Sequence, residues 1–220
     1  MRPFRKIGLL AGGLLLLAGI GSPAAAQNAP TRDDIVAKLD KYQADQELDV
    51  AALRQQVTER SKMRGKNEPP PQKRPPIAPE ITKLPTFNVD IVFDVDTPIV
   101  QPESYQTVGR IADAMVHSSL LPYTFLIVGH IEANGKREAN AILSQRRADA
   151  IRETLVNTFK IAAKRIQAVG LGEEQLLDSA RPTAPVNNQI QIMTLSKIPE
   201  TEQPAAATPG AKKQPAKKKK

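Results

Sequence analysis

The stretch from Tyr123 to Phe159 most restricts the folds open to this chain. A short, largely apolar run from Tyr123 to Val128 predicts a buried strand at the centre of a sheet. Gly129, His130 and a polar loop follow, and the pattern from about Arg137 to Phe159 predicts a long helix. A buried strand that leads into a long helix is typical of folds in which helices cover a sheet.

The flanking sequence predicts three more strands and one more helix. Alternation from Phe87 to Phe93 indicates a half-buried strand, and Pro102 stands where a first helical turn would start. A helical stripe and two further strands are predicted at Val108–Met115, Ile166–Val169 and Ile190–Leu195. The order β-α-β-α-β-β predicts an α+β sandwich over residues 86–198, with two helices packed on one mixed sheet.

The first 26 residues have the pattern of a signal peptide. Arg2, Arg5 and Lys6 precede an uncharged apolar run, and Ala24-Ala25-Ala26 offers a cleavage site. An uncleaved inner-membrane anchor is the alternative interpretation. The chain has no cysteine and therefore no disulfide. We expect a soluble protein of the bacterial periplasm.

The net charge of +8 is concentrated at the two ends of the chain. Residues 1–26 carry three of these charges and residues 212–220 carry six, which leaves −1 for residues 27–211. The body is therefore not a basic nucleic-acid binder. Residues 199–220 form a Lys-rich, Pro/Ala-rich tail for which disorder is predicted. It either keeps the protein soluble or makes weak contact with an anionic surface.

Residues 27–66 are predicted to be a helical N-terminal segment. Thr31 and Asp34 resemble a capping pair, and a break is expected near Asp49. These helices could dock on the domain, pair with another copy or an envelope protein, or be only marginally ordered. Residues 67–85 crowd prolines between Pro69 and Pro79, which favours an extended polyproline spacer.

Arg147 is the basic residue that helical spacing places toward the body of the protein. It shares a four-residue spacing with Leu143, Ile151 and Leu155. A buried guanidinium needs an anionic partner, which is either a ligand or an internal acid. The alternative is that Arg147 lies at the edge of the stripe and pairs locally.

The sequence gives little support for catalysis. His117 and His130 have no partner at metal-ligand spacing, and neither a catalytic triad nor a phosphate-binding glycine loop is visible. We therefore predict a non-catalytic protein without cofactors. Glu132, in the loop before the long helix, is by itself compatible with an ordinary surface acid.

The segment from Gly129 to Ala148 resembles the signature of the OmpA-like peptidoglycan-binding domain. The family pattern, GHTD-xx-G-xxxx-N-xx-LS-xx-RA, runs here without a gap through Gly135, Asn140 and Arg147. Phe93-Asp94 and the Gly170-Leu171-Gly172-Glu173 turn are similar to further family motifs. The resemblance covers about residues 87 to 196.

This resemblance implies a ligand and a set of site residues. The family binds the diaminopimelate residue of the peptidoglycan stem peptide, holding its carboxylate with the arginine and its ammonium with the acid. The matching residues here are Arg147 and Glu132, with Asn140 and Asp94 as further candidates. A cell-envelope protein anchored to the wall, in the periplasm or associated with the outer membrane, is the implied function.

Three positions depart from the family pattern. Ile131 replaces a threonine, Glu132 replaces an aspartate, and Asn187-Asn188-Gln189 stands where the family has Asn-Arg-Arg. A carboxylate displaced by roughly 1 Å matters in a preorganised site. The alternative function is therefore a protein–protein interaction module on the same fold with a degenerate pocket.

Overall fold

The computed structural model describes residues 30–42, 48–63 and 68–199. The predicted signal peptide and the Lys-rich tail beyond Pro199 lie outside these residues and remain predictions. Within the described ranges, no helix is both long enough and apolar enough to cross a membrane.

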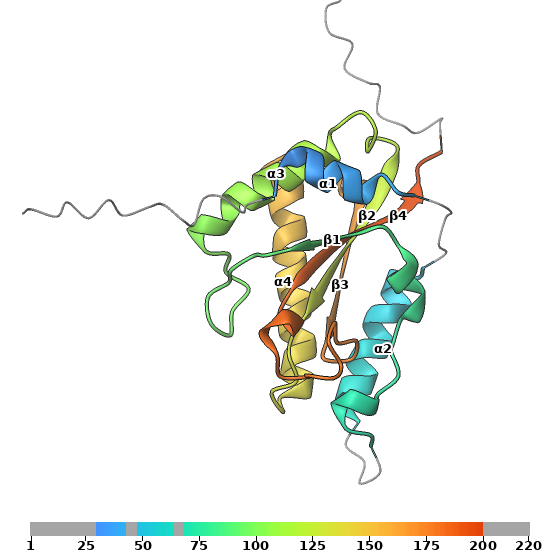
Figure 1. Ribbon diagram of the computed structural model, residues 1–220, viewed down its shortest axis with the longest axis vertical. Coiled ribbons are helices and arrows are strands. Elements are labelled where there is room, and N and C mark those ends of the chain that lie inside the picture. The colour runs from blue at the N-terminus through green and yellow to red at the C-terminus, as the bar shows by residue number, and fades with distance from the viewer. Residues whose placement is uncertain (1–29, 43–47, 64–67, 200–220) are drawn as a thin grey trace, which may run out of the picture.

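A four-stranded mixed sheet forms the centre of the molecule. Its strands are β1 (Thr86–Val89), β2 (Tyr123–His130), β3 (Ile166–Gly172) and β4 (Ile190–Lys197), in the order β1-β4-β2-β3. β2 is parallel to β3, whereas β4 is antiparallel to both β1 and β2. The prediction that Tyr123–Val128 forms a central strand is confirmed, because β2 lies between β4 and β3 (Figure 1).

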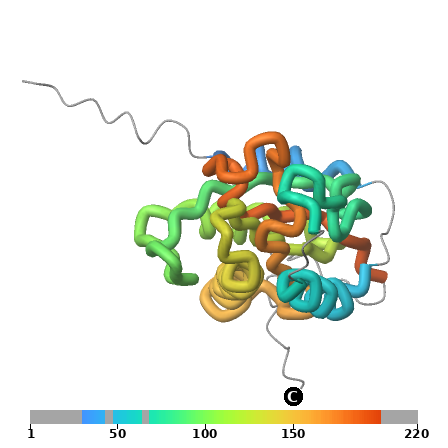
Figure 2. The backbone as a smooth tube through the Cα atoms, turned by 90° about the horizontal axis from the view of Figure 1, so that it is seen from below, coloured from blue at the N-terminus to red at the C-terminus, as the bar shows by residue number. Residues whose placement is uncertain are grey.

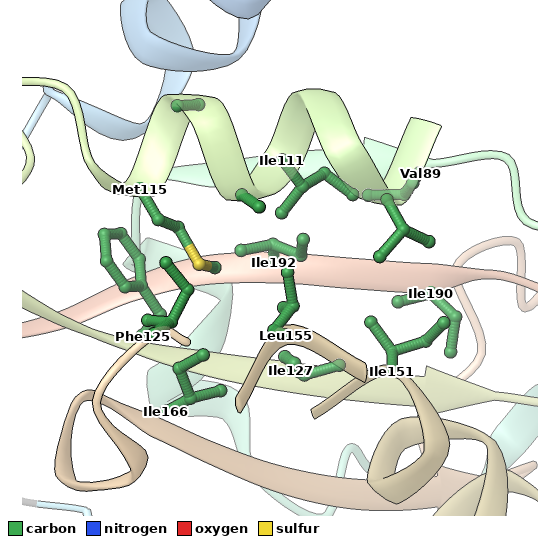
Figure 3. Close-up of a cluster of buried hydrophobic side chains, with 14 of the residues drawn as sticks. Val89, Ile111, Met115, Phe125, Ile127, Ile151, Leu155, Ile166, Ile190 and Ile192 are labelled. Carbon is green, nitrogen blue, oxygen red and sulfur yellow. The ribbon is translucent and has the colours of Figure 1, made fainter. Parts of the chain in front are cut away.

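Two helices cover one face of this sheet. α3 (Tyr105–Met115) follows a 3-10 turn at Pro102–Ser104, and α4 (Arg137–Asn157) packs along β2 and β3. The predicted α+β fold with two helices on one mixed sheet is confirmed. Apolar side chains from both helices and all four strands fill the layer between them (Figure 3): Val89, Ile111, Met115, Phe125, Ile127, Ile151, Leu155, Ile166, Ile190 and Ile192.

The first strand is shorter than its alternating sequence predicts. β1 ends at Val89, and the chain then turns into a hairpin in which Phe93 bridges Val100. The amide of Gln101 donates to the carbonyl of Val92, 2.9 Å away, and the amide of Val92 donates to Ser104 Oγ. The alternation thus continues into a strand-like hairpin arm that pairs with its own chain instead of with β4. We call residues 91–101 the hairpin.

α1 (Arg32–Leu39) packs on the same side of the sheet as α3. Its first turn is closed by the predicted capping pair, since Thr31 Oγ1 accepts from the Asp34 amide and the Asp34 carboxylate accepts from the Thr31 amide. Ile35 and Leu39 are fully buried in the core beside α3 and β1. Docking on the domain is therefore the alternative that the structure supports for this helix.

α2 (Val50–Lys62) covers the other face of the sheet. It begins after Asp49, whose carboxylate accepts from the amide of Ala52, so the predicted break at this position is confirmed. Val50, Leu53 and Val57 pack on the apolar side chains of that face. Figure 2 shows α2 beside α4 at the edge that β3 forms.

The Pro-rich segment is not an extended spacer, and that prediction is wrong. It forms 3-10 turns at Pro71–Lys73 and Pro79–Lys83, and Ala78, Ile81 and Leu84 are buried in the same cluster as α2. The reason is that these apolar residues fall between the prolines and cover sheet surface that would otherwise face water. The Pro-rich segment, α2 and one face of the sheet consequently share one hydrophobic cluster.

Replacement of Leu53 by alanine tests this shared core. Because Leu53 is 3% exposed, Leu53→Ala is expected to lower the free energy of unfolding by about 2–5 kcal/mol. Gln56→Ala, on the exposed side of α2, should change it by less than about 0.5 kcal/mol. Urea unfolding of the chain measures both, and equal effects would show that α2 does not stabilise the domain.

Candidate functional site

Two glycines allow α4 to lie unusually close to the sheet. A Cβ on Gly129 would stand 2.4 Å from the Ser144 carbonyl oxygen, and one on Gly170 would stand 2.0 Å from the Gln145 amide nitrogen. Any side chain there would push the helix away. Hydrogen bonds fix the contact, since Gly170 N donates to Gln145 Oε1 over 2.8 Å. The close approach sets the position of Arg147, which lies two residues further along α4.

Arg147 is half-buried against the hairpin. Its Nε donates to the carbonyl of Thr97 over 3.0 Å, and its guanidinium carbon lies 4.7 Å from the centre of the Phe93 ring. Burial lowers the pKa of Arg147, and the charge of Asp96 partly opposes this shift. Among the described residues, its two terminal nitrogens make no hydrogen bond and no carboxylate is within ion-pair distance.

The expected place of Arg147 on the apolar stripe therefore needs correction. The buried line of α4 runs through Ser144, Ala148, Ile151 and Leu155, and Arg147 lies at its edge. A carbonyl and an aromatic ring hold the guanidinium in place without an internal acid, and its terminal nitrogens stay without a hydrogen bond among the described residues. The buried Arg165 is held in a similar way, with its guanidinium donating to the carbonyls of three residues: Met115, Leu120 and Tyr123.

The backbone of Glu132 is anchored on two sides. Its amide donates to Asn188 Oδ1 over 3.1 Å, and its carbonyl accepts from Asn140 Nδ2 over 3.2 Å. The side chain is half-buried, and within the described ranges its carboxylate has no hydrogen bond or ion pair. The loop is thus ordered by its backbone and leaves a carboxylate available.

Asn140 occupies a supporting position rather than a cavity wall. It is 3% exposed, and Nδ2 lies within hydrogen-bonding distance of the Glu132 carbonyl, Asn134 Oδ1 and Glu173 Oε2. An amide nitrogen has only two hydrogens, so these acceptors already use its full capacity. The structure therefore assigns Asn140 to holding the loop, and direct ligand contact by its amide nitrogen is not expected.

Asp94 belongs to the hairpin turn. Its amide donates to the Ile99 carbonyl, its carbonyl accepts from the Thr97 amide, and its Oδ1 accepts from Gln101 Nε2 over 3.1 Å. These bonds shape the hairpin that presents Thr97 to Arg147. No contact between Asp94 and Arg147 is found in the described part of the chain, so its contribution is to the hairpin.

A cavity of about 320 Å³ lies between the hairpin, α4 and the loop before β4. That loop contains a 3-10 turn at Pro185–Asn187. Arg147 and Asn188 both line the cavity, and Asn188 also holds the Glu132 amide. The remaining lining residues are Ile91, Val92, Phe93, His130, Pro185, Gln189 and Ile190. Arg147 is thus the cation in the wall of the cavity. The loop that carries the Glu132 carboxylate is hydrogen-bonded to Asn188, another lining residue.

His130 is a buried structural residue at the back of the cavity. Its Nδ1 lies 2.9 Å from the Gln175 carbonyl, and its Nε2 lies 2.9 Å from the Gln191 side-chain amide. Burial lowers the pKa of His130 and outweighs both hydrogen bonds, which act in the opposite direction. No cluster of metal-ligating side chains is found among the residues that the structure describes.

Sequence reasoning missed a buried ionic cluster beside the Glu132 loop. Glu173 pairs with Arg74 at 2.7 Å, and Glu174 pairs with Arg60 at 3.0 Å and with Arg137 at 2.5 Å. Glu68 completes the cluster by pairing with Arg137. The Glu174 carboxylate raises the pKa of Arg137. The family-like turn signalled Glu173, but nothing in the sequence pattern indicated partners about 100 residues away.

Comparisons with known proteins assign part of this chain to a family. Residues 92–189 match the OmpA family. These residues include β2 and β3 of the mixed sheet, the two helices α3 and α4, and Arg147 beside its cavity. The chain carries an OmpA family domain over these residues.

Relatives of known description match a little under half of the chain. Outer membrane porin F of Pseudomonas aeruginosa is 33% identical over 97 residues, which cover 44% of this chain and 27% of the relative. The peptidoglycan-associated lipoprotein of Brucella melitensis is 32% identical over 92 residues, which cover 41% and 53%. The chain thus spans about half or less of the length of these relatives.

Among solved structures, the cell wall anchor of the T6SS from Pseudomonas aeruginosa is similar to this chain. It is 25% identical, with a TM-score of 0.40, and the match covers 51% of this chain and 80% of that chain.

The buried His130 predicts a pH dependence of stability. Its folded pKa lies below the ordinary value of 6.5, so the unfolded chain binds the proton first as pH falls. Its contribution to stability is complete above about pH 6.5 and is lost progressively below it. Urea unfolding between about pH 5 and pH 7 should show this slope.

His130→Gln is expected to flatten that slope, and His117→Gln is the matched control. If His130→Gln retained the wild-type slope, a different group would be responsible for the pH dependence.

Proposed function

We propose that this chain is a non-catalytic cell-envelope protein whose OmpA family domain binds peptidoglycan through the diaminopimelate of the stem peptide and so anchors the protein to the cell wall. The observation that carries the proposal is the state of Arg147. Its Nε is fixed by Thr97, while its terminal nitrogens, beside a cavity, form no hydrogen bond with any residue that the structure describes. A guanidinium oriented in this way is preorganised for a carboxylate.

The chemistry of the ligand fits the two charges of the site. Diaminopimelate carries a carboxylate and an ammonium on one carbon. Arg147 would bind the carboxylate, and the carboxylate of Glu132 would bind the ammonium. Each charge-assisted hydrogen bond to a matched group contributes about 1.5–3 kcal/mol. Asn140 would hold the Glu132 loop in place, and Asp94 would shape the hairpin behind Arg147.

The location follows from the same proposal. The signal-like residues 1–26 and the resemblance to outer-membrane and peptidoglycan-associated proteins support the periplasm, at the wall or the outer membrane. The apolar faces of α1 and α2 are already buried in this domain, so they offer little for self-association. The Lys-rich tail would add weak attraction to anionic surfaces, screened by salt.

Removal of the Arg147 guanidinium is the most direct test. Arg147→Ala should reduce retention on purified sacculi and weaken muropeptide affinity roughly 10- to 100-fold, because one charge-assisted contact is lost. Arg146→Ala is the matched control, since Arg146 is the exposed neighbour on the same helix. Equal retention of both variants in a sacculus pull-down would contradict the ligand role of Arg147.

The role of Glu132 is tested with two muropeptides that differ in the charge of the diaminopimelate amine. Glu132→Gln keeps the shape of the side chain and removes its charge. It should weaken binding of a muropeptide with a free diaminopimelate amine by roughly tenfold, and should leave binding of the N-acetylated form unchanged. Isothermal titration calorimetry measures both. An equal loss of affinity for both muropeptides would show that the ammonium does not bind at Glu132.

One observation favours a second candidate function, a protein–protein interaction module. Val95 is 86% exposed and Ile99 is 58% exposed, and both lie on the hairpin beside Arg147. Exposed apolar residues that cluster on one element are typical of protein contacts. Sacculus retention that is insensitive to Arg147→Ala but abolished by Val95→Asp would favour this alternative, with a wall-bound protein as the partner.

A further inference from the structure

We propose that Arg74, in the Pro-rich segment, is a positioning residue for the Glu132 loop, so that docking of this segment sets the affinity of the site. For the identity of the ligand, this inference rests on the proposed function. It assigns a role in binding to residues outside the OmpA family match, which begins at residue 92.

The first step is the burial of the pair formed by Arg74 and Glu173. Their side chains are 12% and 3% exposed, and Arg74 donates to Glu173 Oε1 over 2.7 Å. Arg74 is held in turn by its own segment, since its Nε donates to the carbonyl of Pro69 over 3.2 Å. A carboxylate as buried as Glu173 requires this cation, because an unpaired buried charge is strongly unfavourable.

The second step joins Glu173 to the loop. Its other oxygen, Oε2, accepts from Asn140 Nδ2 over 2.8 Å. The same Nδ2 reaches the Glu132 carbonyl and Asn134 Oδ1. A continuous series of hydrogen bonds therefore runs from Arg74 through Glu173 and Asn140 to Glu132. If Arg74 is removed, Glu173 loses its cation and must move, and Asn140 loses its orientation.

A second contact ties the Pro-rich segment to the cavity independently. The amide of Ala78 donates to Gln175 Oε1 over 2.9 Å, and the Gln175 carbonyl is the partner of His130 Nδ1. His130 lines the cavity. Docking of the Pro-rich segment thus reaches both the loop that carries Glu132 and the back wall of the cavity.

The chain supplies its own matched control for Arg74. Arg60 of α2 also contacts the Pro-rich segment, by donating to the Pro75 carbonyl over 2.7 Å, and pairs with a buried acid of the same turn, but that acid is Glu174. Glu174 is also held by Arg137, and among the described residues neither of its partners forms a side-chain hydrogen bond to Glu132 or Asn140. Arg74→Gln and Arg60→Gln each remove one ion pair to the turn after β3, and only Arg74→Gln removes a link in the series that ends at Glu132.

The experiment compares these two variants and Arg74→Lys in the full chain. Amide hydrogen exchange without ligand reports on Glu132, whose amide donates to Asn188, and on Ala133, whose amide donates to Pro182. Arg74→Gln should accelerate exchange at both amides by roughly tenfold, whereas Arg60→Gln should not. Muropeptide affinity should fall several-fold in Arg74→Gln only, and Arg74→Lys should restore part of both effects. Thermal unfolding of each variant separates these changes from a general loss of stability.

The outcomes are distinct. Equal exchange at Glu132 and Ala133 in Arg74→Gln and Arg60→Gln overturns the inference. Accelerated exchange with unchanged affinity overturns the link between docking and binding. If the wild-type chain binds no muropeptide, the proposed function fails, and exchange at the two amides still decides whether Arg74 positions the loop.

Discussion

The structure depends on the burial of two adjacent carboxylates, Glu173 and Glu174, at the end of β3. Each of them needs a cation beside it, because burying an unpaired charge costs several kcal/mol. The cations come from three separate elements: Arg60 from α2, Arg74 from the Pro-rich segment and Arg137 from the start of α4. The turn after β3 therefore holds together segments that local sequence patterns treat as independent. An ion-pair cluster of this kind fixes arrangement more than it adds stability.

The close approach of α4 to the sheet controls the rest of the site. Gly129 and Gly170 bring the helix backbone against β2 and β3, which leaves Arg147 at the edge of the buried line. There, the Thr97 carbonyl and the Phe93 ring orient the guanidinium and use only part of its hydrogen-bonding capacity. An internal acid would have neutralised Arg147 and removed its use to a ligand. The sequence argument allowed either a ligand or an internal acid as the partner of Arg147, and the described residues contain no ion pair to it, which supports the proposed ligand role.

The sequence predicted the parts of the fold that local periodicity determines. The strand at Tyr123–Val128, the long helix after Arg137 and the capping pair at Thr31 all depend on neighbours in the chain, and all are confirmed. Docking of the Pro-rich segment was not predictable, because Arg74 and Glu173 are 99 residues apart and prolines suggested an extended chain. The candidate ligand residues came from motif register. Their geometry, including the burial of Asn140, required the fold.

The departures from the family pattern have structural consequences that differ in kind. Ile131, where the family has threonine, is 3% exposed and donates its amide to the Gly172 carbonyl, so this change adds apolar packing under the loop. Asn188, where the family has arginine, accepts from the amide of Glu132. A longer acid at position 132 places its carboxylate further from the backbone, and this makes the position of the backbone more important for the site. The asparagine that replaces a cation fixes that backbone. The two substitutions are therefore best understood together: in the proposed site, neutral side chains on both sides, Asn188 and Asn140, position the backbone of the acid.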